Sequence, residues 1–72
     1  MEYNAVALVL TFREAGALFE AANVGLNRRY ELFQKTNDVA IEALLKLARG
    51  MGRRAEVDGA VVMLLPEAGE GI

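Results

Sequence analysis

The chain contains no cysteine, histidine, serine or tryptophan among its 72 residues. Without cysteine it forms no disulfide, and without cysteine or histidine it lacks the ligands of the common zinc sites. The same absences exclude the serine–histidine and cysteine–histidine catalytic constellations. Two threonines, two tyrosines, two lysines and the carboxylates are the nucleophiles that remain. The composition therefore predicts a protein that is not an enzyme and that uses no metal or cofactor.

The chain is short enough that its own core is a weak source of stability. A domain of this size buries only roughly 60% of the surface that its unfolded chain exposes. Because disulfides and zinc are excluded, oligomerisation is the stabilising device that remains. The sequence predicts one small helical domain over residues 1–66, which forms a homodimer or a higher homo-oligomer. After Pro66, the Gly- and Glu-rich residues 67–72 are predicted to form a flexible acidic tail.

The hydrophobic segment near the N-terminus has neither the length of a membrane span nor the flanks of a signal peptide. Residues 5–12 are apolar except for Thr11, whereas a spanning helix needs about 20 apolar residues. Glu2 occupies the place of a basic n-region, and Arg13 and Glu14 follow where a cleavage site would lie. These features predict a cytoplasmic protein that does not bind membranes.

The net charge of −2 is unevenly distributed along the chain. Residues 27–54 carry seven basic and three acidic side chains, for a net charge of +4, and residues 55–72 carry four acidic side chains and no basic one. The basic middle is able to attract an anionic partner. The acidic end is equally able to neutralise the middle within the chain or across a dimer, so both explanations stay open.

The first half of the chain has the periodicity of a helix. Apolar residues follow one another at spacings of three and four, at positions 5, 8, 12, 15, 19, 22 and 26. We expect a helix over about residues 4–24, with Asn4 as its N-cap and Gly25 at its C-terminal end. Residues 5–12 also alternate between larger and smaller side chains, which leaves an N-terminal strand in an α+β fold as the alternative.

A second helix is predicted over residues 27–50, antiparallel to the first in a helical hairpin. Its apolar residues occupy heptad positions, which favours a homo-oligomeric helical bundle. Asn37 is either a buried polar residue that fixes the register or the N-cap of a second helix after a break. Beyond Gly52, Asp58-Gly59 predicts a β-hairpin with a type I′ turn, and a short third helix is the alternative.

Two groups of residues are candidates for binding. The first lies after the expected turn at Gly25, where a helix N-terminus and basic donors favour a partner protein or an anion; it comprises Asn27, Arg28, Arg29 and Tyr30. The second is the expected oligomer interface, drawn from the apolar stripes of both helices: Leu8, Phe12, Phe19, Tyr30, Phe33, Asn37 and Leu44.

These features favour a small non-enzymatic protein-binding module, either an adaptor or an inhibitor that covers a surface of a partner protein. A helix-turn-helix DNA-binding regulator is one alternative, with a turn at residues 23–25 and Asp58-Gly59 in a wing. The negative net charge and the long second helix argue against nucleic acid. A binder of a small anionic ligand, such as a nucleotide, is the other alternative.

Overall fold

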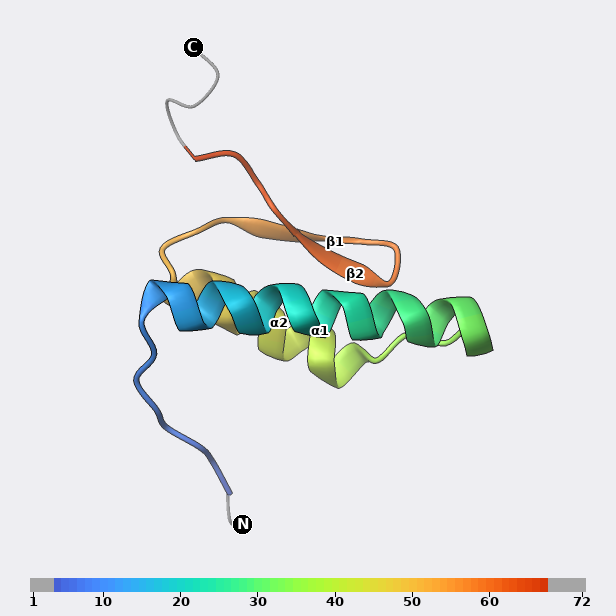
Figure 1. Cartoon of the computed structure of the whole chain (residues 1–72), viewed down its shortest axis with the longest axis horizontal. Coiled ribbons are helices and arrows are strands. Elements are labelled where there is room, and N and C mark those ends of the chain that lie inside the picture. The colour runs from blue at the N-terminus through green and yellow to red at the C-terminus, as the bar shows by residue number, and fades with distance from the viewer. Residues whose placement is uncertain (1–3, 68–72) are drawn as a thin grey trace.

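The computed structural model describes residues 4–67, which form two helices followed by an antiparallel β-hairpin (Figure 1). The elements in chain order are α1 (Phe12–Phe33), α2 (Asp38–Gly50), β1 (Ala55–Asp58) and β2 (Val61–Leu64). The mainly helical prediction is confirmed, and the C-terminal segment is a hairpin and not a third helix. Of the predicted acidic tail, residues 68–72 lie outside the described residues.

Helix α1 begins at Phe12 because Thr11 and Glu14 form a capping box. The Glu14 amide donates to Thr11 Oγ1 at 3.1 Å, and the Thr11 amide donates to Glu14 Oε1 at 2.9 Å. These two bonds satisfy amides that have no partner within the helix. The predicted helix start at residue 4, with Asn4 as N-cap, is therefore wrong. Residues 4–11, which we call the arm, belong to no helix or strand and lead away from α1 (Figure 1).

Helix α1 also continues past Gly25, where the sequence predicted a turn. It ends at Phe33, and Gln34 follows in the left-handed conformation with its amide bonded to the Tyr30 carbonyl at 2.7 Å. A glycine inside a helix costs only about 1 kcal/mol relative to alanine. Burial of Leu26, one residue beyond Gly25, outweighs that cost, so the predicted end of the first helix at residue 24 is wrong.

The predicted helix over residues 27–50 is divided by a break at residues 34–37. Asn37 is the N-cap of α2, and its Oδ1 accepts a hydrogen bond from the Ala40 amide at 3.1 Å. Of the two explanations for Asn37, the N-cap is therefore confirmed. The side chain is exposed and does not lie in a packed heptad position.

Replacing Asn37 with leucine is expected to lower the free energy of unfolding by about 1 kcal/mol, because the first turn of α2 loses its cap. Urea denaturation followed by circular dichroism measures this change. A gain in stability would instead indicate that residue 37 packs against apolar side chains.

The hairpin turn differs by one residue from the predicted turn. Asp58 pairs with Val61, so the two central residues are Gly59 and Ala60, and only Gly59 has a positive φ, of 66°. A glycine with positive φ at the first central position is typical of a type II′ turn and not of type I′. The side chains of Val62 and Leu64 lie on the same face of β2, and Val62 is only 1% exposed.

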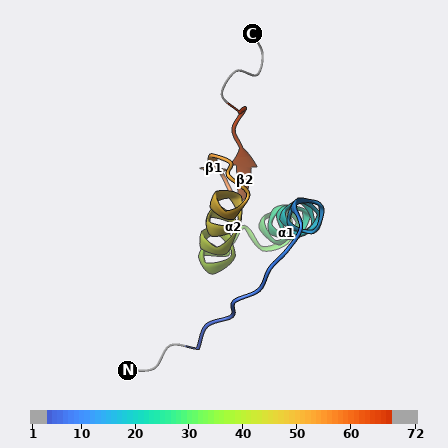
Figure 2. The same ribbon diagram turned by 90° about the vertical axis from the view of Figure 1, so that its left-hand side faces the viewer.

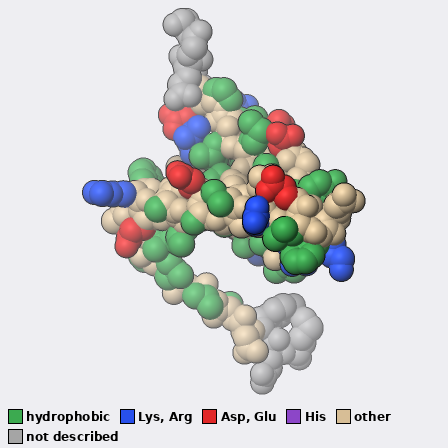
Figure 3. Space-filling view, turned by 45° about the vertical axis from the view of Figure 1, so that its right-hand side comes forward, with side chains coloured by type: hydrophobic (Ala, Val, Ile, Leu, Met, Phe, Trp, Pro, Cys, Tyr) green, Lys and Arg blue, Asp and Glu red, His purple; other side chains and the backbone are tan. Residues whose placement is uncertain are grey.

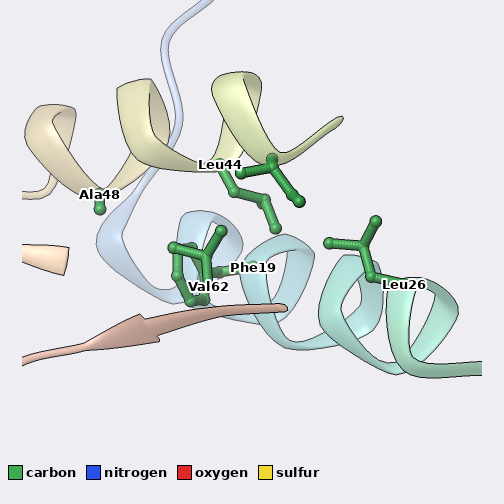
Figure 4. Close-up of a cluster of buried hydrophobic side chains, with 6 residues drawn as sticks. Phe19, Leu26, Leu44, Ala48 and Val62 are labelled. Carbon is green, nitrogen blue, oxygen red and sulfur yellow. The ribbon is translucent and has the colours of Figure 1, made fainter. Parts of the chain in front are cut away.

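The hydrophobic core lies where the two helices meet the hairpin (Figure 4). Helix α2 runs back along α1, and the hairpin lies on one side of the helix pair while the arm lies on the other (Figures 1 and 2). Each of the three elements contributes buried side chains: Phe19 and Leu26 from α1, Ile41, Leu44 and Ala48 from α2, and Val62 from β2.

A polar contact in the middle of α1 fixes the hairpin to the helices. Asn23 Nδ2 donates to the Val62 carbonyl at 2.8 Å, and Asn23 Oδ1 accepts from the Val62 amide at 2.9 Å. Val62 is paired with Val57 in β1, and its own amide and carbonyl point toward α1. One side chain thus satisfies both backbone groups of the most buried residue of the hairpin.

Candidate functional site

The four residues predicted to bind a partner or an anion lie together in the C-terminal part of α1. Asn27, Arg28, Arg29 and Tyr30 are all exposed. They are not at a helix start, because α1 begins 15 residues before Asn27. The amides of Asn27 to Tyr30 are inside a helix, so the N-terminal anion site expected here is not formed. The turn that the helix-turn-helix alternative placed at residues 23–25 is likewise part of α1.

This part of α1 extends past the rest of the fold. Helix α1 has 22 residues and α2 has 13, and the C-terminal end of α1 continues beyond both α2 and the hairpin (Figure 1). We call residues 27–33 the overhang. The buried stripe of α1 runs through Phe19 and Leu26 and continues at helical spacing to Tyr30 and Phe33. Those two aromatic side chains are 47% and 63% exposed.

The overhang combines apolar side chains with two basic ones and one acidic one, Glu31. Tyr30, Leu32 and Phe33 are large exposed apolar residues. At helical spacing Arg29 is a neighbour of Leu32 and Phe33, and Arg28 is a neighbour of Leu32. Within residues 4–67, neither arginine lies within 4.0 Å of a carboxylate; the ion pairs there are Lys46–Glu42 and Arg53–Glu67. Figure 3 shows hydrophobic side chains beside basic ones at this end of the molecule.

The structure also removes an unfavourable effect of the helix dipole on the two arginines. The sequence placed them at a helix N-terminus, where the dipole disfavours cations. They lie instead inside α1, before its last turn, where the dipole has little effect on a side-chain charge. Arg28 and Arg29 are therefore compatible with the stability of the helix and remain available for contacts outside the chain.

The residues expected at an oligomer interface have three different environments. Phe19 and Leu44 are buried in the core of the single chain, so a second copy is not needed to cover them. Asn37 caps α2. The other four are exposed, two at the arm end of α1 and two in the overhang: Leu8, Phe12, Tyr30 and Phe33.

An apolar groove separates the arm from the two helices. Its volume is about 750 Å³, and its walls are residues 6–10 of the arm, the N-terminal half of α1 and the C-terminal half of α2. The other side chains that line it, from α1, α2 and the C-cap of α2, are almost all apolar: Phe12, Ala15, Leu18, Ala43, Lys46, Leu47 and Met51. The arm, which lines one side of this arm groove, lies on the side of the helices opposite the hairpin (Figure 2).

Sequence reasoning missed Asn23 and the separation of the arm from α1. Asn23 is a polar residue beside Ala22 and Leu26 on the buried stripe, and a polar side chain in that position needs a hydrogen-bond partner. That requirement was a usable signal, although the sequence does not identify Val62 as the partner. The Thr11-Phe12-Arg13-Glu14 capping box was the signal for the end of the arm.

Across residues 4–67, no three acidic side chains come together as a potential metal site. Neither helix of that segment has the length and hydropathy to cross a bilayer. Searches of protein-family models, curated proteins and solved structures found no match to this chain.

Proposed function

We propose that this protein is a small non-enzymatic protein-binding module that acts as a homodimer and binds a partner protein on the overhang. The supporting observation is that the apolar stripe of α1, buried at Phe19 and Leu26, continues uncovered through Tyr30 and Phe33. Exposed apolar patches with a polar rim are typical of protein interaction sites. Assembly into a homo-oligomeric helical bundle and a cytoplasmic location belong to the same proposal.

The chemistry of the overhang indicates what kind of partner surface it fits. Tyrosine and arginine are enriched among the residues that contribute most to binding energy at interfaces. Tyr30 and Phe33 fit an apolar depression, while Arg28 and Arg29 favour carboxylates around it. We therefore expect a partner with an apolar pocket bordered by acidic side chains. Binding of this kind suits an adaptor, or an inhibitor that occludes the bound surface.

The double variant Arg28→Glu/Arg29→Glu is expected to bind the partner at least tenfold more weakly, because both cations become anions facing acidic groups. The loss should shrink at high salt, where the wild-type contact is already screened. The helix should lose at most about 0.3 kcal/mol at each position, because both residues lie before the last turn of α1, where the effect of the helix dipole is small.

The experiment uses affinity capture from a lysate of the source organism, followed by calorimetry with the purified partner. Arg13→Glu/Arg49→Glu is the matched control, because it changes the net charge equally at exposed positions outside the overhang. Equal weakening by both double variants would show a general effect of charge. Unchanged binding by folded Arg28→Glu/Arg29→Glu would overturn the assignment of the overhang.

A further inference from the structure

We propose that the outer edge of β1, the edge that does not pair with β2, binds an extended basic segment of a partner protein as a third strand of the sheet. The segment carries lysine or arginine at alternate positions, with apolar residues between them. This surface belongs to the hairpin and is separate from the overhang, so the inference goes beyond the proposed function and does not depend on it.

Helix α1 blocks the other edge of the sheet, which belongs to β2. Asn23 binds the amide and the carbonyl of Val62 that face away from β1, with hydrogen bonds of 2.9 and 2.8 Å. Among the described elements, α1 contacts β2 but not β1, and β1 lies on the side of β2 away from α1 (Figure 2). A third strand therefore has access to β1 and not to β2 at Val62.

The hydrogen-bond pattern of the hairpin leaves backbone groups of β1 directed outward. Opposite residues in an antiparallel pair alternate between pairs that exchange hydrogen bonds and pairs that do not. Val57 is opposite Val62, whose backbone groups bind Asn23, so the amide and carbonyl of Val57 also point away from their partner strand. By the same alternation, those of Ala55 point outward too. Two such residues in one strand form the template to which another strand adds.

The two faces of β1 differ in chemistry. Val57 lies on the face that Val62 turns to the core, and it is 48% exposed, so a third strand has apolar surface to cover there. Glu56 and Asp58 lie on the opposite face and are exposed. Within residues 4–67, neither carboxylate forms an ion pair. An added strand complements both faces when its apolar and basic residues alternate.

The charge of this edge selects the occupant. Opposite charges on neighbouring strands stabilise the pair, and like charges destabilise it. Strand β1 contains two carboxylates and no basic residue, so neither an acidic segment nor β1 of a second copy supplies the complement. The preceding arginines are directed elsewhere, because Arg53 pairs with Glu67 and Arg54 donates to the Pro66 carbonyl at 3.3 Å. Charge complementarity therefore favours a basic segment.

The probe is the acetylated peptide Thr-Lys-Val-Lys-Thr, titrated into the isotope-labelled protein and followed by NMR. The amides of Ala55 and Val57 should show the largest changes in chemical shift. The matched peptide Thr-Glu-Val-Glu-Thr should bind at least roughly tenfold more weakly. Glu56→Gln/Asp58→Asn should weaken binding of the lysine peptide by about tenfold. The control Glu20→Gln/Glu31→Gln changes the net charge equally on α1 and should leave binding unchanged.

Methylation of the peptide backbone tests strand addition in the wild-type protein. One methylated peptide carries the group on the valine amide, and the other carries it on both lysine amides. Successive amides of an extended peptide point to opposite sides, so the two peptides lose donors on opposite edges. Only one edge of an added strand faces β1, so one methylated peptide should bind at least roughly tenfold more weakly than the other.

Val57→Pro is the corresponding change in the protein. Proline removes the outward amide of residue 57 and no hydrogen bond of the hairpin, and edge strands tolerate proline where the N–H faces solvent. The variant should keep the circular dichroism of the wild type and should bind the lysine peptide at least roughly tenfold more weakly. If Val57→Pro does not fold, the two methylated peptides decide the question by themselves.

The remaining outcomes are distinct. Undiminished binding by folded Val57→Pro, or equal affinities for the two methylated peptides, overturns strand addition. Equal affinities for the lysine and glutamate peptides overturn the basic partner. Dissociation of a wild-type dimer by Val57→Pro would assign the edge to a second copy and overturn the proposal. Phe33→Ala should bind the lysine peptide as the wild type does, so a failure of the overhang is measured separately.

Discussion

Replacing Phe19 with alanine is expected to lower the free energy of unfolding by about 3–5 kcal/mol. Phe19 is 6% exposed and lies in the core with side chains of α2 and β2. Its removal both loses apolar burial and leaves a cavity that the short chain cannot fill by rearrangement. A domain of this length has a total stability of about 4–11 kcal/mol, so the variant should be largely unfolded in mild urea.

Phe33→Ala is the matched control, with the same change in the same helix. Phe33 is exposed, so its replacement should alter the free energy of unfolding by less than about 0.5 kcal/mol. It should nevertheless weaken partner binding, because Phe33 belongs to the overhang. Urea denaturation of both variants tests the contrast. Similar destabilisation by the two changes would mean that the overhang is covered within the folded protein and is not a binding surface.

Replacing Asn23 with alanine is expected to lower the free energy of unfolding by about 2–3 kcal/mol. The change removes both hydrogen bonds to Val62 and leaves a buried amide and a carbonyl without partners. The hairpin should then separate from α1 more often than the helices separate from each other. Hydrogen exchange of the Val62 amide should be faster by a larger factor than that of amides in α2.

Asn27→Ala is the control for this change, because Asn27 lies one turn later in the same helix and is exposed. Alanine has a higher helix propensity than asparagine, so this variant should be as stable as the wild type or more stable by roughly a few tenths of a kcal/mol. Equal losses at both positions would refute the role of the Asn23 contact in holding the hairpin.

The helical periodicity identified part of the buried side of α1 and α2, although it also included the exposed Leu8 and Phe12 and assigned Phe19 and Leu44 to an oligomer interface. The spacing that included Ala15, Phe19 and Leu26 marks the stripe that is buried, and Leu44 and Ala48 mark the buried side of α2. The Asp58-Gly59 pair predicted the hairpin that the structure shows. The N-cap at residue 37 was one of two predicted alternatives, because asparagine is a preferred N-cap residue. These features depend on local geometry, which a short stretch of sequence contains in full.

The ends of α1 were predicted wrongly for reasons that are specific to two positions. At the start, the apolar spacing ran unbroken through residues 5–12, and only the pair Thr11 and Glu14 marked the boundary. At the other end, Gly25 was taken as a terminator. Its small intrinsic penalty is outweighed by contacts that Asn23 and Leu26 make with residues distant in the chain. The predicted binding residues Arg28 and Arg29 therefore lie in the C-terminal part of α1 and not, as predicted, at the start of a helix.

The sequence by itself determined the absence of cysteine, histidine and serine chemistry, the mainly helical character of the part before residue 51, and the C-terminal hairpin. Each of these depends on composition or on neighbours within a few positions. Only the tertiary structure decided that α1 passes through Gly25, that Asn23 binds Val62 39 residues away, and that the overhang and the arm are left uncovered. The physical reason is that these features depend on which elements pack together, and small local preferences yield when burial of a few large side chains favours another arrangement.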